Sequence, residues 1–183
     1  MLSEIINKVS LFHLLYQIDQ DLARQKQQEG CPHCGGPLHY SNYLRKPRGS
    51  RQNIPNEYLV RLSLCCGREE CRKRTIPPSC RFMGRRVYWG CVILVVMTLK
   101  QARPSGSATN SLMRQFGISR NTLLRWFAYF REVFPSSAKW QMLRGRVSTS
   151  VENVRLPGSL LEHFFAQFGE GEAGLAACLQ FLA

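Results

Sequence analysis

Negative charge is scarce in this sequence, which has 12 Asp and Glu residues against 25 Lys and Arg residues in a chain of 183. Its only aspartates, Asp19 and Asp21, lie in a predicted helix near the start of the chain, and its glutamates are scattered. Nuclease and strand-transfer enzymes hold Mg²⁺ with clustered carboxylates, and no Ser or Tyr lies in a recognisable nucleophile setting. The sequence therefore predicts a protein without a catalytic centre of its own.

Long apolar runs are also missing. The longest, residues 87–99, is about a dozen residues, whereas a membrane-spanning helix needs ~20. The first apolar stretch is interrupted by Glu4, Lys8 and His13, and no small-residue cleavage site follows it, so we expect no secretory signal. We expect a protein of the cytoplasm without membrane contact. Eight cysteines in such a chain are more typical of metal ligands or core residues than of disulfides.

Positive charge is what the sequence has in excess: the formal net charge is +13. Residues 45–155 hold 22 basic and 5 acidic side chains, while residues 1–44 are near neutral and residues 156–183 are slightly acidic. An excess of this size favours a polyanionic partner, because unneutralised Lys and Arg side chains repel one another. We expect double-stranded DNA to bind the middle of the chain and protein partners to bind its ends. The alternative is a basic surface that is merely solvated.

The hydrophobic pattern divides the chain into four segments and predicts a mainly α fold with a small β zinc ribbon. Apolar residues recur at three- and four-residue steps through residues 1–28, which predicts one amphipathic helix. Its apolar face either covers the body of the protein or binds a second subunit. The predicted segments are an N-terminal helix over 1–29, a zinc ribbon with a basic linker over 30–84, a helix-turn-helix domain over 85–135 and a C-terminal helical segment over 136–183.

Three local patterns add detail to these segments. The alternation of residues 58–64 predicts a half-buried strand, and residues 85–102 predict a mostly buried helix. Two short C-terminal helices are expected over 159–183, with a break in the glycine-containing stretch 169–174. Cys91 and Cys178 fall on apolar faces, so we expect both to be core residues.

Four cysteines have the spacing of a structural zinc site. Cys31 and Cys34 flank a Pro-His pair and precede two glycines, which is typical of a tight turn that directs two thiolates at one metal ion. Tetrahedral Zn²⁺ needs four ligands, and Cys66 and Cys71 follow after an intervening hairpin. We predict one structural Zn²⁺ per chain, with no open position for Lewis-acid chemistry. Because the second pair has a longer gap than the first, alternative ligands stay open: Cys65, His33, His39 and Cys80.

Residues 109–128 match the pattern of a helix-turn-helix, in which two helices cross at a short turn. Gly117 occupies the turn, Ser119 is a natural N-cap, and the second helix is predicted over 120–134. Met113 departs from the pattern, since a smaller residue normally lets the two helices close. The apolar wedge between the helices is expected to contain Leu112, Phe116, Ile118, Leu123 and Trp126.

If the second helix enters the major groove, its outward residues read the bases. We expect Arg120, Asn121 and Arg125 to contact base edges, because Arg pairs with guanine and Asn with adenine. Ser119 and Thr122 are expected to contact phosphate. The alternative is a helical hairpin whose basic residues are solvated. A second phosphate-binding set is predicted in the linker between the two modules, and it comprises Arg72, Lys73, Arg74, Arg81, Arg85 and Arg86.

The order of these parts resembles the small zinc-ribbon plus helix-turn-helix proteins of bacterial mobile elements, and the DNA-recognition regions of insertion-sequence transposases. The resemblance rests on residues 31–34, 66–68, 71–72, 117–126 and 156–161. It implies a sequence-specific DNA-binding accessory protein of transposition or recombination. Such a protein contacts a separate recombinase or transposase subunit through its terminal helices, or forms a homodimer. The carboxylate-bearing catalytic fold of these transposases has no counterpart in the sequence, and this departure favours an accessory protein.

Two other functions stay open at this point. A stand-alone transcription regulator would bind a palindromic operator as a dimer, because paired recognition helices sit about one DNA turn apart. An RNA-binding zinc module would release duplex DNA when single-stranded or structured RNA competes for it.

Overall fold

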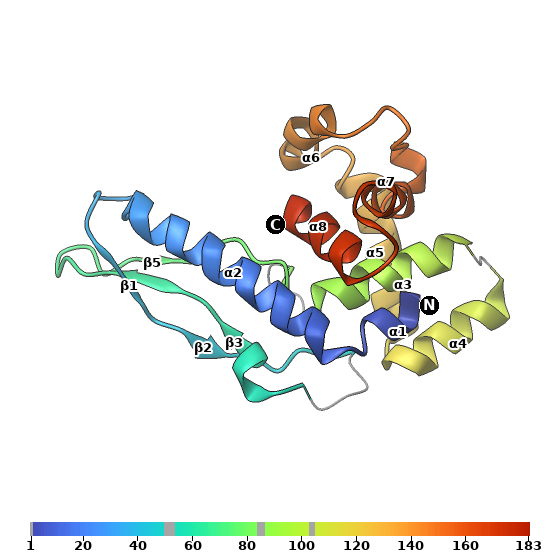
Figure 1. The fold of residues 1–183 in the computed structure, drawn as a ribbon, viewed down its shortest axis with the longest axis horizontal. Coiled ribbons are helices and arrows are strands. Elements are labelled where there is room, and N and C mark those ends of the chain that lie inside the picture. Colours follow the sequence, from blue (N-terminus) through green and yellow to red (C-terminus); the bar gives the residue numbers. More distant parts are fainter. Residues whose placement is uncertain (1, 50–53, 84–86, 103–104) are drawn as a thin grey trace.

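The computed structural model describes residues 2–49, 54–83, 87–102 and 105–183. The chain is mainly helical and has a small antiparallel sheet at one end of its long axis (Figure 1). The strands are β1 Leu38–Tyr40, β2 Tyr43–Leu44, β3 Val60–Arg61, β4 Leu64–Cys66 and β5 Arg74–Thr75. The α-helices are α1 Leu2–Ile5, α2 Val9–Glu29, α3 Gly90–Ala102, α4 Gly106–Phe116, α5 Arg120–Ala128, α6 Ala138–Leu143, α7 Gly158–Phe168 and α8 Glu172–Leu182. The predicted mainly α fold with a small β part is confirmed.

The prediction of a single N-terminal helix over residues 1–28 is wrong in one respect, because the structure has two helices there, α1 and α2. Between them Lys8 is extended, with φ −86° and ψ 128°. The break places Ile6 in the core, where it is almost fully buried. The Asn7 side-chain amide donates to the Ser3 carbonyl at 3.0 Å, which satisfies one of the carbonyl groups that the end of α1 leaves open.

α2 is a 21-residue helix that runs from the sheet to the helical body (Figure 1). Its buried residues include Leu11, Leu15, Asp19 and Ala23, which recur every four residues and form one stripe. Asp19 thus occupies a position where an apolar residue is expected. The stripe packs inside the protein, so α2 covers the body of the molecule. The helix ends at Gly30, whose φ of 77° favours glycine.

The strands form a three-stranded sheet with the order β1-β4-β5 and a two-stranded sheet of β2 and β3. β1 pairs with β4 and β2 pairs with β3 in the same register, so that Tyr40 faces Leu64 and Tyr43 faces Arg61. β5 adds to the other side of β4. The strand predicted over 58–64 is displaced, because Tyr58 lies in a 3-10 helix, Asn56–Leu59, and the strand residues are those of β3 and β4.

Successive residues of a strand point to opposite faces of a sheet, and the two faces here differ. The buried face carries Leu38, Leu64, Cys66 and Thr75. The opposite face, which we call the open face, carries a row of three paired residues, His39, Cys65 and Arg74. None of these three is buried.

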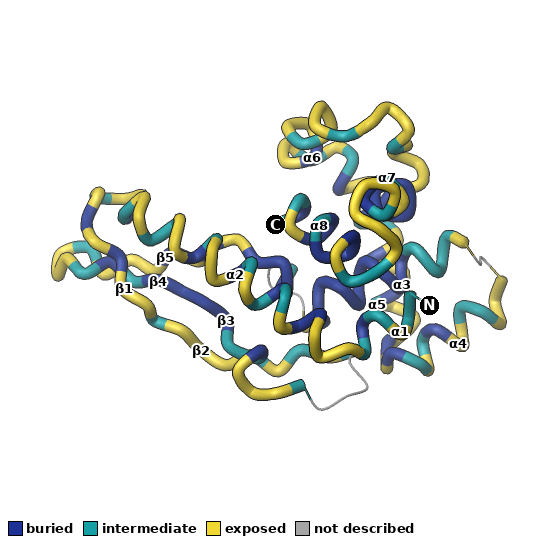
Figure 2. The backbone as a smooth tube through the Cα atoms, viewed as in Figure 1, coloured by how far each residue is buried: buried dark blue, intermediate teal, exposed yellow. Residues whose placement is uncertain are grey.

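α3 lies at the centre of the helical body, where α4, α5, α7 and α8 contact it (Figure 2). Its residues from Gly90 to Met97 are all buried, which confirms the predicted burial. The helix begins at Gly90 and not at Arg85: Val87–Trp89 are not helical, and residues 84–86 lie outside the described part. Cys91 and Cys178 are fully buried core residues, as predicted, and desolvation raises the pKa of the Cys91 thiol to about 12.

The two predicted C-terminal helices are present as α7 and α8, which pack against each other. α8 also contacts α2 and α3, and Leu2 and Ile5 of α1 pack against the same core, so both ends of the described chain lie in the helical body. α6 and two 3-10 turns, Arg144–Arg146 and Asn153–Arg155, connect α5 to α7. Within the described ranges, no helix has both the length and the apolar composition needed to cross a bilayer.

α4 and α5 meet at Gly117, which has the left-handed conformation, with φ 58° and ψ 40°. Ser119 Oγ accepts a hydrogen bond from the Thr122 N–H at 3.2 Å, so the predicted N-cap is confirmed. The helix predicted over 120–134 is α5 followed by a π-helical turn, Tyr129–Val133. The turn between α4 and α5 is therefore fixed by one glycine and one cap.

We expect Gly117→Ala to destabilise the fold by about 1 to 2 kcal/mol, because a residue with a Cβ loses about this much free energy in the left-handed backbone conformation. A Cβ at this position would meet no atom within 4 Å, so the loss reflects backbone conformation alone. Gly117→Asn should recover part of it, and Gly106→Ala, at an open helical position without a positive φ, should not be destabilising. Urea unfolding measures all three; an unaffected Gly117→Ala protein would contradict the left-handed turn.

Candidate functional site

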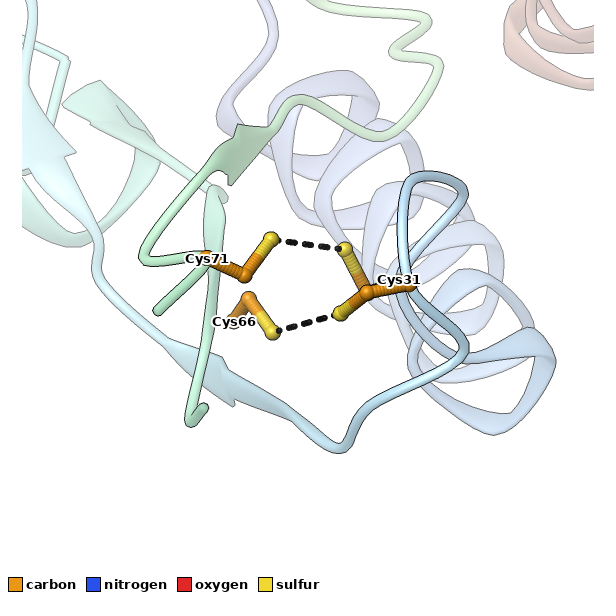
Figure 3. A group of neighbouring side chains, drawn as sticks. Cys31, Cys66 and Cys71 are labelled. Carbon is orange, nitrogen blue, oxygen red and sulfur yellow. Dashed lines mark hydrogen bonds between the residues drawn. The ribbon is translucent and has the colours of Figure 1, made fainter. Parts of the chain in front are cut away.

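Four cysteine sulfur atoms form a cluster (Figure 3). The cluster lies at the end of the sheet that is farther from the helical body (Figure 1). Cys31 and Cys34 lie in the turn after α2, Cys66 ends β4, and Cys71 lies in the turn to β5. All four Sγ atoms lie within 4.8 Å of one another. The Cys31 and Cys71 sulfurs are 3.8 Å apart, and those of Cys34 and Cys66 are 3.5 Å apart. These are the four cysteines of the sequence-predicted set.

The sulfur separations suit a tetrahedral metal ion. Bonds of about 2.3 Å from a central Zn²⁺ place neighbouring sulfurs about 3.8 Å apart along the edges of a tetrahedron. All eight cysteines are free thiols, so no disulfide uses these sulfur atoms. The cluster could therefore hold a metal ion, and four thiolates suit a soft or borderline one.

Backbone amides stabilise negative charge on the cluster. In three cases the N–H two residues further on is hydrogen-bonded to the sulfur: His33 to Cys31, Arg68 to Cys66 and Lys73 to Cys71. The His33 N–H is the main reason why the pKa of the Cys31 thiol falls to about 7; burial opposes it, and the Cys34 N–H assists it. Such bonds favour the thiolate, which is the form that binds metal. At Cys66 and Cys71 the amides are outweighed by burial and by hydrogen bonds within the cluster, so the pKa of the Cys66 thiol is raised to about 12 and the pKa of the Cys71 thiol is also raised.

The alternative ligands left open by the sequence lie outside the cluster. Cys65 precedes Cys66 in β4, so strand alternation directs it to the open face, where its thiol donates to the Arg72 carbonyl at 3.4 Å. His39 lies on the same face, and its ring packs over Gly67. Cys80 is buried beside Asp19 instead, as the hydrogen bond from its N–H to that carboxylate shows.

The sheet end has little hydrophobic core of its own. Its buried cluster consists of Cys31, Leu38, Leu64 and Cys66, against which Cys34 and Cys71 pack. Four of these six residues are the clustered cysteines. A metal ion bound there would join the turn after α2 to the turn after β4, and its binding free energy would become folding free energy for this end.

Arg81 is a correction to the predicted phosphate-binding set, because its side chain is fully buried. Its Nε donates to Asp19 Oδ2 at 2.9 Å. Its two terminal nitrogens donate to the carbonyl oxygens of Tyr58, at 2.6 Å, and Val60, at 3.0 Å. A guanidinium bonded in this way inside the protein is not exposed to nucleic acid. It joins α2 to the segment around β3.

Asp19 is a residue whose importance the sequence analysis missed. Besides Arg81, its carboxylate accepts hydrogen bonds from Ser79 Oγ at 2.5 Å and from the Cys80 N–H at 2.6 Å. The signal was present, because Asp19 stands between Leu15 and Ala23 in the apolar stripe of its helix. An aspartate in such a stripe indicates a buried cation partner, since isolated charges are almost never fully buried.

The rest of the predicted linker set divides into two groups. Arg72, Lys73 and Arg74 are exposed, on β5 and in the turn that precedes it. Arg74 also donates to Ser41 Oγ at 3.3 Å. Arg85 and Arg86 lie outside the described residues.

The residues of α5 separate into a buried and an exposed face. Leu123 and Trp126 are buried, and the Trp126 ring makes an edge contact with Tyr88 at 5.0 Å between centroids. The predicted base-contacting residues face solvent: Arg120, Asn121 and Arg125 are all exposed. Ser119 is exposed and Thr122 is half-buried, with their hydroxyl oxygens 2.9 Å apart.

The cysteine cluster and α5 lie in different parts of the molecule, the cluster at the sheet end and α5 in the helical body (Figure 1). The structure therefore brings the four predicted cysteines together, but it does not bring them to the predicted base-contacting residues. Comparisons with protein families, curated proteins and solved structures found no match to the chain.

Proposed function

We propose that this chain is a sequence-specific DNA-binding protein in which α4 and α5 form a helix-turn-helix with α5 as the recognition helix. The observation that carries the proposal is the division of α5 into two faces. Leu123 and Trp126 fix the helix in the core, while Arg120, Asn121 and Arg125 are free of that packing and exposed. Arg and Asn are the side chains that pair in two-point fashion with guanine and adenine in the major groove.

The way α5 is held supports this role. Its N-terminus is capped by Ser119, and the Tyr88 hydroxyl donates to the Gly117 carbonyl at 3.1 Å, which ties the turn to the segment before α3. A side chain that reads a base must be presented in one orientation, so a rigid support raises specificity. The exposed N-terminal turn of α5 is the part that enters the groove in the proposed complex.

The proposed role of the cysteine cluster is structural. One Zn²⁺ per chain would be bound by Cys31, Cys34, Cys66 and Cys71, which makes the sheet end a zinc ribbon. Four protein ligands complete a tetrahedron and leave no position for a reacting water. The protein proposed here therefore binds DNA without a catalytic centre.

Arg72, Lys73 and Arg74 are proposed to contact phosphates, because they are exposed beside the cluster in a chain with a net charge of +13. The biological role we propose is that of an accessory of a bacterial mobile element, acting in the cytoplasm at the nucleoid. In this role it would bring element DNA to a separate recombinase or transposase. This part rests on the resemblance described above and on the absence of a catalytic carboxylate cluster from the sequence.

We expect Arg125→Ala to reduce affinity for a selected duplex site by roughly 1 to 3 kcal/mol and to relax the preference at one base pair. The site is first selected from random duplexes with the wild-type protein, and affinities are then measured at one fixed salt concentration. Arg144→Ala is the charge-matched control, because Arg144 is exposed and follows α6. It should weaken all duplexes about equally. Identical base preferences in the Arg125→Ala and wild-type proteins would contradict the recognition role of α5.

A further inference from the structure

The open face of the sheet presents planar rings and positive charge together. His39, Cys65 and Arg74 form one row across β1, β4 and β5. The Arg74 guanidinium carbon lies 5.6 Å from the centre of the Tyr43 ring, which places Tyr43 beside this row. Tyr43 is 38% exposed, so part of this side chain is open to solvent.

Both rings are held in place by their neighbours. A Cβ at Gly67 would lie 2.6 Å from His39 Nε2, so the imidazole packs directly on that glycine. Arg74, which lies beside the Tyr43 ring, is itself held by its hydrogen bond to Ser41. The rings are therefore positioned before any ligand arrives, which reduces the entropy lost on binding.

The charge around these rings is mainly positive, although Glu69 and Glu70 lie exposed in the turn before Arg72. Arg72 and Lys73 precede Arg74 and are exposed, while residues 38–66 contain a single acidic side chain, Glu57. Exposed rings among arginines and lysines are the combination that recognises single-stranded nucleic acid, because bases stack on the rings and phosphates lie against the cations.

We propose that the open face of the sheet binds unpaired nucleotides, with bases stacked on Tyr43 and His39 and the backbone bound by Arg72, Lys73 and Arg74. This rests on the nucleic-acid partner proposed above but not on α5. The occupant is single-stranded because the bases of a duplex already stack on one another, so a ring on a flat sheet face reaches none of them. The phosphates that Arg72, Lys73 and Arg74 contact are then those of an unpaired strand, and the chain has two nucleic-acid surfaces, one for paired and one for unpaired strands.

The test measures binding of fluorescent 12-nucleotide oligo(dT) and oligo(rU) to the full chain by anisotropy. Tyr43→Ala should weaken oligonucleotide binding roughly tenfold or more, and Tyr43→Phe should retain it, because stacking needs the ring and not the hydroxyl. Tyr40→Ala is the matched control: Tyr40 is 46% exposed, but it pairs with Leu64, so strand alternation directs it away from the row of His39, Cys65 and Arg74. It should bind like the wild type. The tighter-bound oligonucleotide identifies the strand as DNA or RNA.

Equal oligonucleotide binding by the Tyr43→Ala and Tyr40→Ala proteins would overturn the proposal, and so would no binding of either oligonucleotide by the wild type at low salt. Affinity for the selected duplex is measured in parallel and should not change in Tyr43→Ala. Loss of duplex recognition in Arg125→Ala, without loss of oligonucleotide binding, shows the two surfaces to be separate. Failure of the duplex proposal and failure of this one therefore give different results.

Discussion

Replacing Cys66 with serine is expected to empty the metal site and unfold the sheet end of the molecule, whereas replacing Cys65 leaves both intact. The two residues are neighbours in one strand, but only the Cys66 sulfur lies in the cluster, 3.5 Å from that of Cys34. A three-cysteine remnant binds zinc far more weakly, and the small core around Leu38 and Leu64 cannot replace the lost crosslink.

Metal analysis of the purified proteins measures this directly. We expect about one ion per chain in the wild type and in Cys65→Ser, and a small fraction of that in Cys66→Ser. Amide hydrogen exchange should rise across residues 31–44 and 60–75 and stay low in α3, whose core is separate from the cysteine cluster. Full metal content in Cys66→Ser, or a metal-stripped wild type with unchanged exchange, would refute the structural role.

A second large effect is expected from Asp19→Asn, which should reduce the free energy of unfolding by roughly 3 to 5 kcal/mol. The substitution leaves the Arg81 guanidinium buried without its counter-charge. It also places an amide where the carboxylate now accepts bonds from Ser79 and from the Cys80 N–H. Desolvation of an unpaired cation dominates the loss.

Asp21→Asn is the control for this experiment, because Asp21 lies in the same helix but its side chain is 67% exposed in its pair with Arg24. An exposed pair contributes little, so the unfolding midpoint in urea should hardly change. Adding Arg81→Met to Asp19→Asn should recover much of the stability, since no buried charge then remains. Equal midpoints for the two aspartate variants would show that the buried ion pair contributes no more to stability than the exposed pair.

The parts of the structure that depend on neighbouring residues followed from the sequence. A glycine before a serine predicted the turn and cap at Gly117 and Ser119, because both signals act within a few residues. The cysteines of the cluster were predicted as a set for the same reason: each pair lies in one turn. The choice between Cys65 and Cys66 needed the strand itself, since only the direction of the side chain separates them.

The predictions that were wrong concern features that depend on contacts between residues far apart in the sequence. Arg81 resembled its exposed neighbours in the linker, and its partner Asp19 lies 62 positions away. The break between α1 and α2 has no proline or glycine to announce it, and follows from the burial of Ile6 against the rest of the core. Tyr43 and Arg74 are 31 positions apart, and they are brought together by the pairing of β1 with β4 and of β4 with β5.

The length of α2 fixes how far the cysteine turn at its end lies from the start of the helix. At 1.5 Å per residue its 21 residues span roughly 30 Å, close to the ~34 Å that one turn of B-DNA occupies along its axis. One end of this helix leads into the cysteine turn and its side packs on α8, so the helix holds the cysteine turn in a fixed position relative to the helical body. If the sheet end and α5 both contact nucleic acid as proposed, the two contacts are held apart by a rigid element and not by a flexible linker. Inserting a single residue into α2 would rotate the cysteine turn by about 100° about the helix axis and change the direction in which it faces.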